Sequence, residues 1–398
     1  MRVVILGGGI TGLFVSYYLR KDGHDVTLID KKTETSSTSI HNAGFLTPSF
    51  APSPPLSIMK VASAIFRPSG ALYISLREVA KNPGWFLRAV RTGIGSHERD
   101  VVDMGKRSLA LYGRFFRDEG AEDIDLQRGV IGLYRDEAEA RTVAEEVGGD
   151  FLRGAEVDAL GFRDLRGGVY FRDELSINPP KLVSFLRSSL EHMGVRMRSS
   201  KEAELKGDKG RVERAVFDGL PIEGDAFVVA AGSKSAEVLR PLGYRPRLLP
   251  ARGLVMIFES DAPRVVGRPA LLEDYGIAVV QHNPRTVRVT GFFEMKGFDA
   301  GFGERRKRWL REATMKHVGG FERLRLAEVG VGYRPCTPDQ LPLVGRVPAM
   351  SNCFVAAGTC RLGMTLAPVA GHLISSLIGD EHETNEGLAK LLDPARLK

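Results

Sequence analysis

The sequence predicts a mixed α/β fold, α+β overall, in which a nucleotide-binding lobe is joined to a second lobe built on a mostly antiparallel sheet. Three observations support this prediction. The chain opens with a strand, a glycine-rich turn, a helix and a second strand. Residues 254–291 contain β-type runs without intervening helical patterns, which is typical of an antiparallel sheet. At 398 residues the chain is long for one hydrophobic core, so two lobes are expected.

The first thirty residues predict a dinucleotide site. Residues 2–6 indicate a short buried strand that runs into GGGITG at 7–12, which fits the pattern G-x-G-x-x-G. A helix follows, residues 26–29 form a second strand, and Asp30 ends it. Glycines let the backbone approach a pyrophosphate, the helix N-terminus supplies donors, and the acid is placed to bond a ribose hydroxyl. The spacing therefore predicts a Rossmann-like lobe.

The later elements follow from periodicity and turn residues. Residues 36–55 are rich in Ser, Thr and Pro, which favours a loop. Helices are predicted at 101–119, 136–147, 179–193 and 367–378. Strands are predicted at 129–134, 226–232, 277–280, 287–290 and 353–357.

The segment 56–94 combines apolar residues at helical spacing with interleaved Lys and Arg. One interpretation is a set of amphipathic helices that cover a core. A second is a surface for peripheral contact with a membrane or a partner subunit. The pattern leaves both open.

Composition excludes several classes of protein. With 43% hydrophobic and 26% charged residues, the chain is ordinary for a soluble globular protein. The net charge of +7 is spread along the chain, so no nucleic-acid partner is expected. Three cysteines form no disulfide framework, and their spacing fits no zinc site, so no metal is expected.

Location and source are also addressed by the sequence. Met1 is followed at once by the first strand and no apolar run reaches the length of a membrane span, so a cytoplasmic protein is expected, with membrane association on the cytoplasmic face as the alternative. Only six Asn and three Gln occur, and thermolabile amides are depleted in thermophilic proteins. We therefore expect a thermophilic source.

A second motif stands near the C-terminus. Residues 334–339 read RPCTPD, residues 341–345 read LPLVG, and the strand at 353–357 leads into GTCRLGMTLAP at 358–368. Together with the N-terminal motif, this resembles the D-amino-acid oxidase superfamily of FAD-dependent oxidoreductases, and is most similar to its D-amino-acid dehydrogenase small-subunit and glycine oxidase branches. The resemblance covers most of the chain and implies a discontinuous FAD-binding domain at 1–60, 165–240 and 328–398, with a substrate domain at 61–164 and 241–327.

The resemblance also implies noncovalent FAD and the residues that hold it. Relatives with covalent flavin attach it through a particular His or Cys, and His41 is the one candidate here, otherwise a polar loop residue. The expected cofactor-binding residues are Gly7, Gly9, Ile10, Thr11, Gly12, Asp30, Lys31, Ser37, Asn42, Ala43, Gly44, Ala231, Gly232, Gly358, Arg361, Leu362, Gly363, Met364 and Thr365.

The implied reaction oxidises the Cα–N bond of an amino acid by hydride transfer to flavin N5 and gives an imino acid. Its substrate needs a fixed cation for the carboxylate, and the planar fork of Arg suits this. Arg334 matches the family's carboxylate-binding Arg, and Arg361 matches a second active-site Arg of glycine-oxidase-like relatives. The alternative for Arg334 is a structural ion pair with a carboxylate such as Asp339. Tyr275 and Tyr333 are further candidate contacts.

The sequence of one predicted strand indicates which electron acceptor the protein uses. Oxygen-using sarcosine oxidases carry a Lys before a Gly over the flavin, whereas residues 288–291 here read RVTG. This favours a dehydrogenase that uses a quinone, a dye or an electron-carrier protein. Cys336 and Cys360 both lie in the flavin-lining motifs, and whether they form a disulfide stays open.

The leading interpretation is an FAD-dependent amino-acid dehydrogenase acting on a D-amino acid. A cyclic imino acid such as proline or hydroxyproline is an alternative substrate. A glycine- or sarcosine-type oxidase and a flavin subunit of an electron-transfer complex complete the set of functions that the sequence leaves open.

Overall fold

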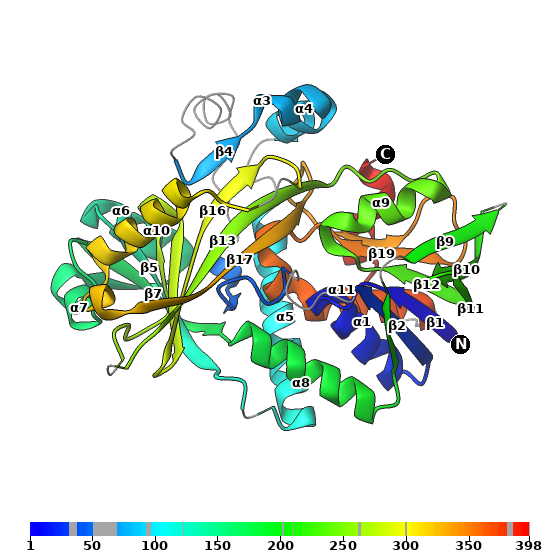
Figure 1. The fold of residues 1–398 in the computed structure, drawn as a ribbon, viewed down its shortest axis with the longest axis horizontal. Coiled ribbons are helices and arrows are strands. Elements are labelled where there is room, and N and C mark those ends of the chain that lie inside the picture. The colour runs from blue at the N-terminus through cyan, green and yellow to red at the C-terminus, as the bar shows by residue number, and fades with distance from the viewer. Residues whose placement is uncertain are drawn as a thin grey trace.

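The computed structural model describes residues 1–31, 38–50, 70–92, 97–121, 123–200, 203–208, 210–261, 264–298, 301–379 and 385–397. Two sheets dominate it and lie side by side (Figure 1). One is a six-stranded, mainly parallel sheet, and the other is a ten-stranded, mainly antiparallel sheet. The predicted fold class is confirmed.

The six-stranded sheet has the order β18-β19-β12-β1-β2-β8. All neighbours in it are parallel except β18 and β19. Its strands are β1 (Arg2–Leu6), β2 (Asp25–Lys31), β8 (Arg196–Ser200), β12 (Ala226–Val229), β18 (Leu343–Arg346) and β19 (Cys353–Ala357). The order brings the two ends of the chain together, because only β12 separates β1 from β19.

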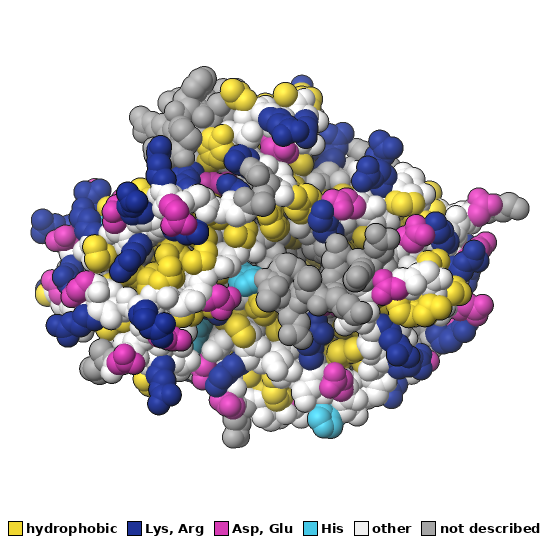
Figure 2. Space-filling view, viewed as in Figure 1, with side chains coloured by type: hydrophobic (Ala, Val, Ile, Leu, Met, Phe, Trp, Pro, Cys, Tyr) yellow, Lys and Arg dark blue, Asp and Glu magenta, His cyan; other side chains and the backbone are white. Residues whose placement is uncertain are grey.

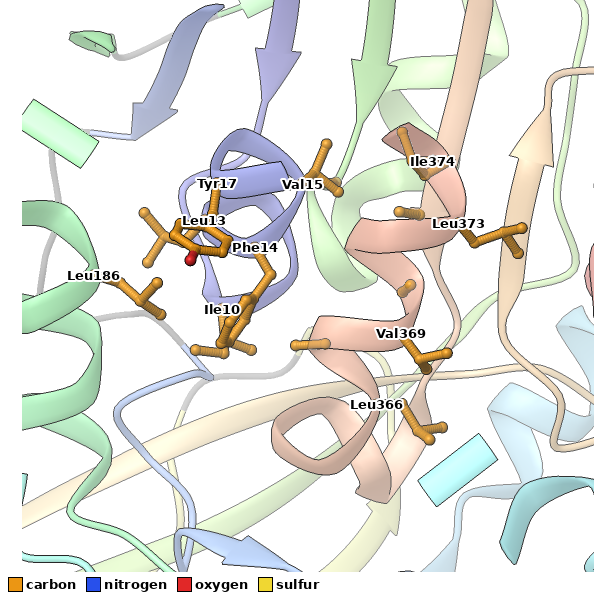
Figure 3. Packing of buried hydrophobic residues seen from close by; sticks show 14 of the residues in the cluster. Ile10, Leu13, Phe14, Val15, Tyr17, Leu186, Leu366, Val369, Leu373 and Ile374 are labelled. Carbon is orange, nitrogen blue, oxygen red and sulfur yellow. The ribbon is translucent and has the colours of Figure 1, made fainter. Parts of the chain in front are cut away.

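One face of this sheet is covered by helices α1 (Ile10–Lys21), α5 (Glu98–Glu119), α8 (Pro179–His192) and α11 (Gly363–Gly379). Apolar side chains of α1 and α11 form a continuous core together with Leu186 of α8 (Figure 3). The two helices can approach closely because Gly371 has no side chain: a Cβ at this position would lie 2.7 Å from the Phe14 carbonyl carbon. This close packing fixes the start of α11 relative to the glycine-rich turn.

The opposite face carries a small sheet of β9 (Ala203–Asp208), β10 (Arg211–Phe217) and β11 (Leu220–Glu223). Leu205, Val212 and Ala215 from this sheet pack in one cluster with apolar residues of β1 and β12. Helices α9 (Ser235–Leu239) and α12 (Glu386–Leu392) belong to the same lobe (Figure 1).

The ten-stranded sheet has the order β17-β13-β16-β15-β14-β5-β7-β3, with β4 added to β16 and β6 added to β7. Its strands are β3 (Phe45–Leu46), β4 (Leu72–Ile74), β5 (Gln127–Tyr134), β6 (Asp150–Arg153), β7 (Gly167–Ser176), β13 (Leu249–Glu259), β14 (Ala270–Leu272), β15 (Ile277–Asn283), β16 (Thr286–Met295) and β17 (Arg325–Cys336). The helices α6 (Glu137–Val147), α7 (Gly154–Ala159) and α10 (Glu304–His317) pack on it (Figure 1).

Short helices α3 (Leu76–Lys81) and α4 (Pro83–Thr92) follow β4. In α4 the side chains of Trp85, Phe86 and Ala89 are buried, as expected for helices that cover a core. Leu76 and Leu87 are exposed, and the interpretation of this segment as a contact surface stays a prediction. Its first part, residues 56–69, lies outside the described residues.

The predicted elements differ from the observed ones mainly at their ends. The terminal helix begins at Gly363 and not at residue 367, because the turn before it is already helical. The predicted strand 226–232 ends at Val229. Strands β3, β7 and β17 fall largely inside the ranges predicted for the FAD-binding domain but pair in the ten-stranded sheet. Sheet membership therefore does not follow the predicted boundaries at these places.

Two properties of the described residues bear on the predictions about charge and membrane spans. Lys and Arg side chains are scattered among Asp and Glu over the face shown in Figure 2, without one continuous basic patch. Among the described residues, the stretch Cys360–Gly379 is long and apolar enough to cross a membrane, a finding that the run-length prediction missed. It is mostly buried against α1 and α5, as the core helix of a folded lobe is.

Candidate active site

A cavity of about 1020 Å³ extends between the two sheets, from the glycine-rich turn to the inner side of the ten-stranded sheet. It brings both sequence motifs together, although they lie near opposite ends of the chain. The predicted residues that line it are Gly7, Gly9, Ile10, Thr11, Asp30, Asn42, Ala43, Ala231, Gly232, Arg334, Arg361, Leu362, Gly363, Met364 and Thr365.

Five predicted residues do not appear in that lining. Gly12, Gly44 and Gly358 pack against backbone or side chains beside it, at Gly7, Ile177 and Thr337 respectively. Lys31 ends β2, and Ser37 lies outside the described residues.

The glycine-rich turn needs its glycines for steric reasons. Gly7 has φ +116°, and a Cβ there would lie 2.3 Å from the Ala230 carbonyl oxygen. A Cβ at Gly12 would lie 1.8 Å from the Gly7 carbonyl oxygen. Any side chain at either position would push β1, α1 and β12 apart. The turn thus places the N-terminus of α1 at the cavity, where the Ile10 N–H donates to Ser39 Oγ at 2.9 Å, and a helix N-terminus in this position can bind phosphate groups.

Asp30 lies at the end of β2 and is held by a residue that the sequence did not reveal. Arg187 of α8 donates from Nη2 to Asp30 Oδ2 at 2.7 Å and to the Gly8 carbonyl oxygen at 3.0 Å. One guanidinium therefore connects the predicted ribose-binding acid to the glycine-rich turn. No pattern in α8 marks this arginine, because it is one of several polar residues of an amphipathic helix.

The loop at 38–44 is fixed against β17 and β16. The Thr38 hydroxyl bonds the backbone N–H and carbonyl of Tyr333, at 2.8 and 3.0 Å. Arg288 donates to the Ile40 carbonyl oxygen at 2.9 Å. His41, expected to be an ordinary polar loop residue, is buried, and its Nε2 lies 3.6 Å from Glu328.

Arg334 lies on β17 and faces the cavity. Its Nη1 donates to the Phe292 carbonyl oxygen at 2.9 Å, and its guanidinium covers the backbone of Gly253 in the neighbouring strand. No carboxylate of the described residues lies within 4 Å of it. Burial, and then the nearby charge of Arg361, lower the pKa of Arg334 to about 10.

The alternative of a structural ion pair between Arg334 and Asp339 is wrong. Asp339 accepts from Arg396 Nε at 2.9 Å, near the C-terminus. A buried structural pair does occur nearby, where Arg252 of β13 donates to Glu294 at 2.7–2.8 Å. Arg334 and Arg252 therefore differ in kind: Arg252 is neutralised by a carboxylate, and Arg334 is available to a ligand.

Arg361 enters the cavity from the turn η7 (Cys360–Leu362), directly before α11. Burial lowers the pKa of its guanidinium, and the negative charge of Glu273 opposes this. Cys336 and Cys360 form a disulfide, which settles the question that the sequence left open. The bond ties the segment of Arg334 to the segment of Arg361. Two like charges in one cavity repel each other, so an anion bound between them would be favoured.

Glu273 is a second residue that the sequence did not reveal. It begins the turn η5 (Glu273–Tyr275) between β14 and β15 and lines the cavity with Tyr275. Burial raises the pKa of the Glu273 carboxyl to about 7, while the charge of Arg361 acts in the opposite direction. An acid after a short strand carries no recognisable spacing, so only the folded structure places it here.

The residues present fit FAD. The cradle formed by Gly7, Gly12 and the N-terminus of α1 accepts a pyrophosphate, with Asp30 beside it for the ribose. At the other end of the same cavity, the backbone at 362–365 begins α11, whose N-terminal dipole favours negative charge. The cavity joins both ends, as an extended dinucleotide requires.

Comparisons with known proteins agree with an FAD-binding site. A model of the family described as FAD dependent oxidoreductase matches residues 2–377. The chain is 28% identical over 408 residues to the D-amino acid dehydrogenase of Allorhizobium ampelinum, covering 95% of this chain and 94% of that protein.

Solved structures show the same fold. Glycine oxidase from Geobacillus kaustophilus superposes with a TM-score of 0.77 at 22% identity, covering 100% of this chain and 98% of that one. L-proline dehydrogenase from P. horikoshii gives 0.74 at 17% identity, covering 99% and 97%. With a family model that spans nearly the whole chain, this protein belongs to the family of FAD-dependent oxidoreductases.

Proposed function

We propose that this protein is an amino-acid dehydrogenase that oxidises the Cα–N bond of a D-amino acid and passes the electrons to a quinone or an electron carrier. The observation that carries the proposal is the state of Arg334. It is half-buried, it has no carboxylate partner among the described residues, and it shares its cavity with a second arginine. The name of the curated relative supports the choice of a D-amino acid.

The arginine pair accounts for recognition of the carboxylate. A substrate carboxylate supplies the negative charge that Arg334 lacks, and the guanidinium fork binds it with two parallel hydrogen bonds. Because the Phe292 carbonyl already holds Nη1 of Arg334, the guanidinium is fixed before the substrate arrives. A fixed anchor orients the α-carbon, which contributes to the rate as well as to binding.

The remaining lining sets the surroundings of the reaction. When bound, FAD accepts the two electrons and the hydrogen of the Cα–H bond. Leu72, Trp85 and Phe293 provide apolar walls that exclude water from the substrate end of the cavity. In this low-dielectric environment the arginine charges act more strongly than they would in water.

Two features support the choice of acceptor and of noncovalent FAD. The residues of β16 that line the cavity are Thr290, Gly291, Phe292 and Phe293, and the whole of β16 contains no lysine. His41 is packed against Gly330 with its ring beside Glu328, which occupies the one candidate for covalent attachment.

The test is a substrate screen on the purified yellow protein. Both enantiomers of each amino acid, proline and hydroxyproline included, are supplied with a redox dye, and peroxide is measured beside dye reduction. We expect D-amino acids to reduce the dye with little peroxide. Stoichiometric peroxide at a comparable rate would support an oxidase, and dye reduction by L-proline alone would overturn the D-amino-acid assignment.

A further inference from the structure

Three carboxylates line the cavity within the described part of the chain: Asp30, Glu273 and Asp274. Asp30 is at the nucleotide end and accepts from Arg187 at 2.7 Å. Asp274 is exposed and accepts from the backbone N–H of Arg135 at 3.0 Å. The carboxylate of Glu273 has no hydrogen-bond or ion-pair partner among the described residues. It is therefore the acid in this cavity that remains available to a ligand.

The backbone is anchored on both sides of Glu273. Strand β14 pairs with β5 on one side and β15 on the other, and Leu272 is in register with both Leu133 and Ile277. After Glu273, the ring of Tyr275 packs 4.9 Å from the ring of His317. The turn is thus anchored immediately before and after the acid, so its carboxylate is presented from a rigid element.

The surroundings of Glu273 connect it to the arginine pair. Arg361 on η7 is close enough for each group to change the pKa of the other. The other charged or titratable groups that face it are Glu139 on α6, Asp274 beside it and Tyr134 at the end of β5. Arg361 is the cation in this set, and it belongs to the proposed carboxylate site.

We propose that Glu273 binds the α-amino group of the substrate and accepts the proton that this group must lose before its carbon can be oxidised. This inference rests on the proposed amino-acid dehydrogenase function. An amino acid bears its carboxylate and its ammonium on the same carbon, so an acid beside the carboxylate site is close to the ammonium. The arginines and Glu273 together form a site complementary to a zwitterion.

The step is a proton transfer without electron transfer. One N–H bond of the α-ammonium breaks, and one O–H bond forms on the Glu273 carboxylate. The products are a neutral amine and a neutral carboxylic acid, and the proton later leaves to solvent through the open cavity. Burial raises the pKa of Glu273 to about 7, which makes it a better proton acceptor than an ordinary glutamate, and a base is most effective near the operating pH.

The variant Glu273→Gln tests this, with a D-amino acid that has an apolar side chain as substrate. At pH 7 we expect kcat/KM to fall by about 100-fold or more, the range found for loss of a general base. The loss should shrink as the pH approaches the pKa of the free amino acid, because neutral amine is then supplied by the solvent. Asp274→Asn is the matched control, since it removes a neighbouring charge without removing the base. Its kcat/KM relative to that of the wild type should not rise at high pH.

Binding measurements separate this role from a structural one. Propionate has the skeleton of alanine without its amino group, and its Kd can be read from the perturbed visible spectrum of the bound flavin. Glu273→Gln should leave this Kd close to that of the wild type, since the arginine site is intact. A loss of kcat/KM that is the same at all pH values, or a parallel loss of propionate binding, would overturn the proposal.

Substrate side chains provide the last discrimination. If Glu273→Gln impairs D-lysine but not D-norleucine, the acid reads a basic side chain and the proposal is wrong. Wild-type kinetics in the variant would refute this inference alone. If none of the amino acids tested supported dye reduction by the wild-type protein, the proposed function would be refuted, and this inference with it.

Discussion

Replacing Arg334 by methionine should raise the stability of the protein while it lowers the activity. A pKa lowered from 12.5 to about 10 corresponds to about 3 kcal/mol of unfavourable free energy for the charged form. Against this stands one hydrogen bond, to the Phe292 carbonyl, worth about 1 kcal/mol. Methionine fills a similar volume without charge, so the free energy of unfolding should rise by about 2 kcal/mol.

Arg252→Met is the matched control, because Arg252 lies on the adjacent strand and is itself buried. Its guanidinium donates to Glu294 at 2.7–2.8 Å, and Arg306 donates to the same carboxylate at 2.6 Å. Removing one partner of a buried ion pair costs about 3–5 kcal/mol when the other charge is left unpaired, and because Glu294 keeps Arg306 the cost here should lie near or below the lower end of this range. The two substitutions should therefore change stability in opposite directions.

The assays are thermal unfolding of the FAD-bound protein without substrate, and steady-state dye reduction with a D-amino acid. Loss of a bidentate carboxylate contact of about 1.5–3 kcal/mol should lower kcat/KM by about 10- to 100-fold in Arg334→Met. Arg334→Lys keeps the charge but not the fork and should remain impaired. Arg334→Met that unfolds earlier than wild type and keeps its kinetics would show that Arg334 is structural.

Three further predictions concern other parts of the chain. Asp30→Ala should weaken FAD binding by about 10- to 100-fold, measured by flavin release on dilution, without changing turnover at saturating FAD; equal retention of FAD would remove the ribose assignment. The Cys336–Cys360 disulfide joins residues 24 apart in the sequence, and its reduction should lower the free energy of unfolding by about 3 kcal/mol. Reduction should also raise KM for the amino acid, and an unchanged KM would show that the bond does not position the arginines. Burial raises the pKa of Glu174 to about 7, so the stability that the neutral Glu174 side chain contributes is full below pH 4.5 and is lost as the pH rises to about 7. Across this range, the free energy of chemical unfolding should fall by up to about 3 kcal/mol more in the wild type than in Glu174→Gln. Parallel pH curves for the two proteins would contradict this.

The nucleotide-binding end was predictable because local chemistry dictates it. The glycine-rich turn, the acid after the second strand and the C-terminal turn into α11 are each contiguous in sequence, and each has one conformation that satisfies it. The fold class follows from the same elements. The start of the terminal helix was less well predicted, because Cys360 in the η7 turn before Gly363 is held by a disulfide to Cys336, which is distant in the sequence.

The two arginines of the proposed substrate site could be named only through their motif. Arg334 and Arg361 could be named because they lie in recognisable segments, and their common cavity agrees with that. Arg187 and Glu273 could not be named, since the groups that surround each one are distant in the sequence: Asp30 accepts from Arg187, and Arg361 shares the cavity with Glu273. Whether Asp339 or a ligand meets Arg334 also depended on Arg396, which lies in the last turn of the described chain.

The packing of α1 against α11 has a consequence for synthesis of the protein on the ribosome. The apolar face of α1 is complete once Lys21 has been added, but its partner helix is translated near the end, as residues 363–379. Until then the first βαβ unit has neither this partner nor β19. A nascent chain that exposes such a face depends on shielding by chaperones or by its own collapsed intermediates. A nonsense mutation that removes α11 and α12 would also remove the helix start that lines the cavity, and we expect such a chain not to retain FAD.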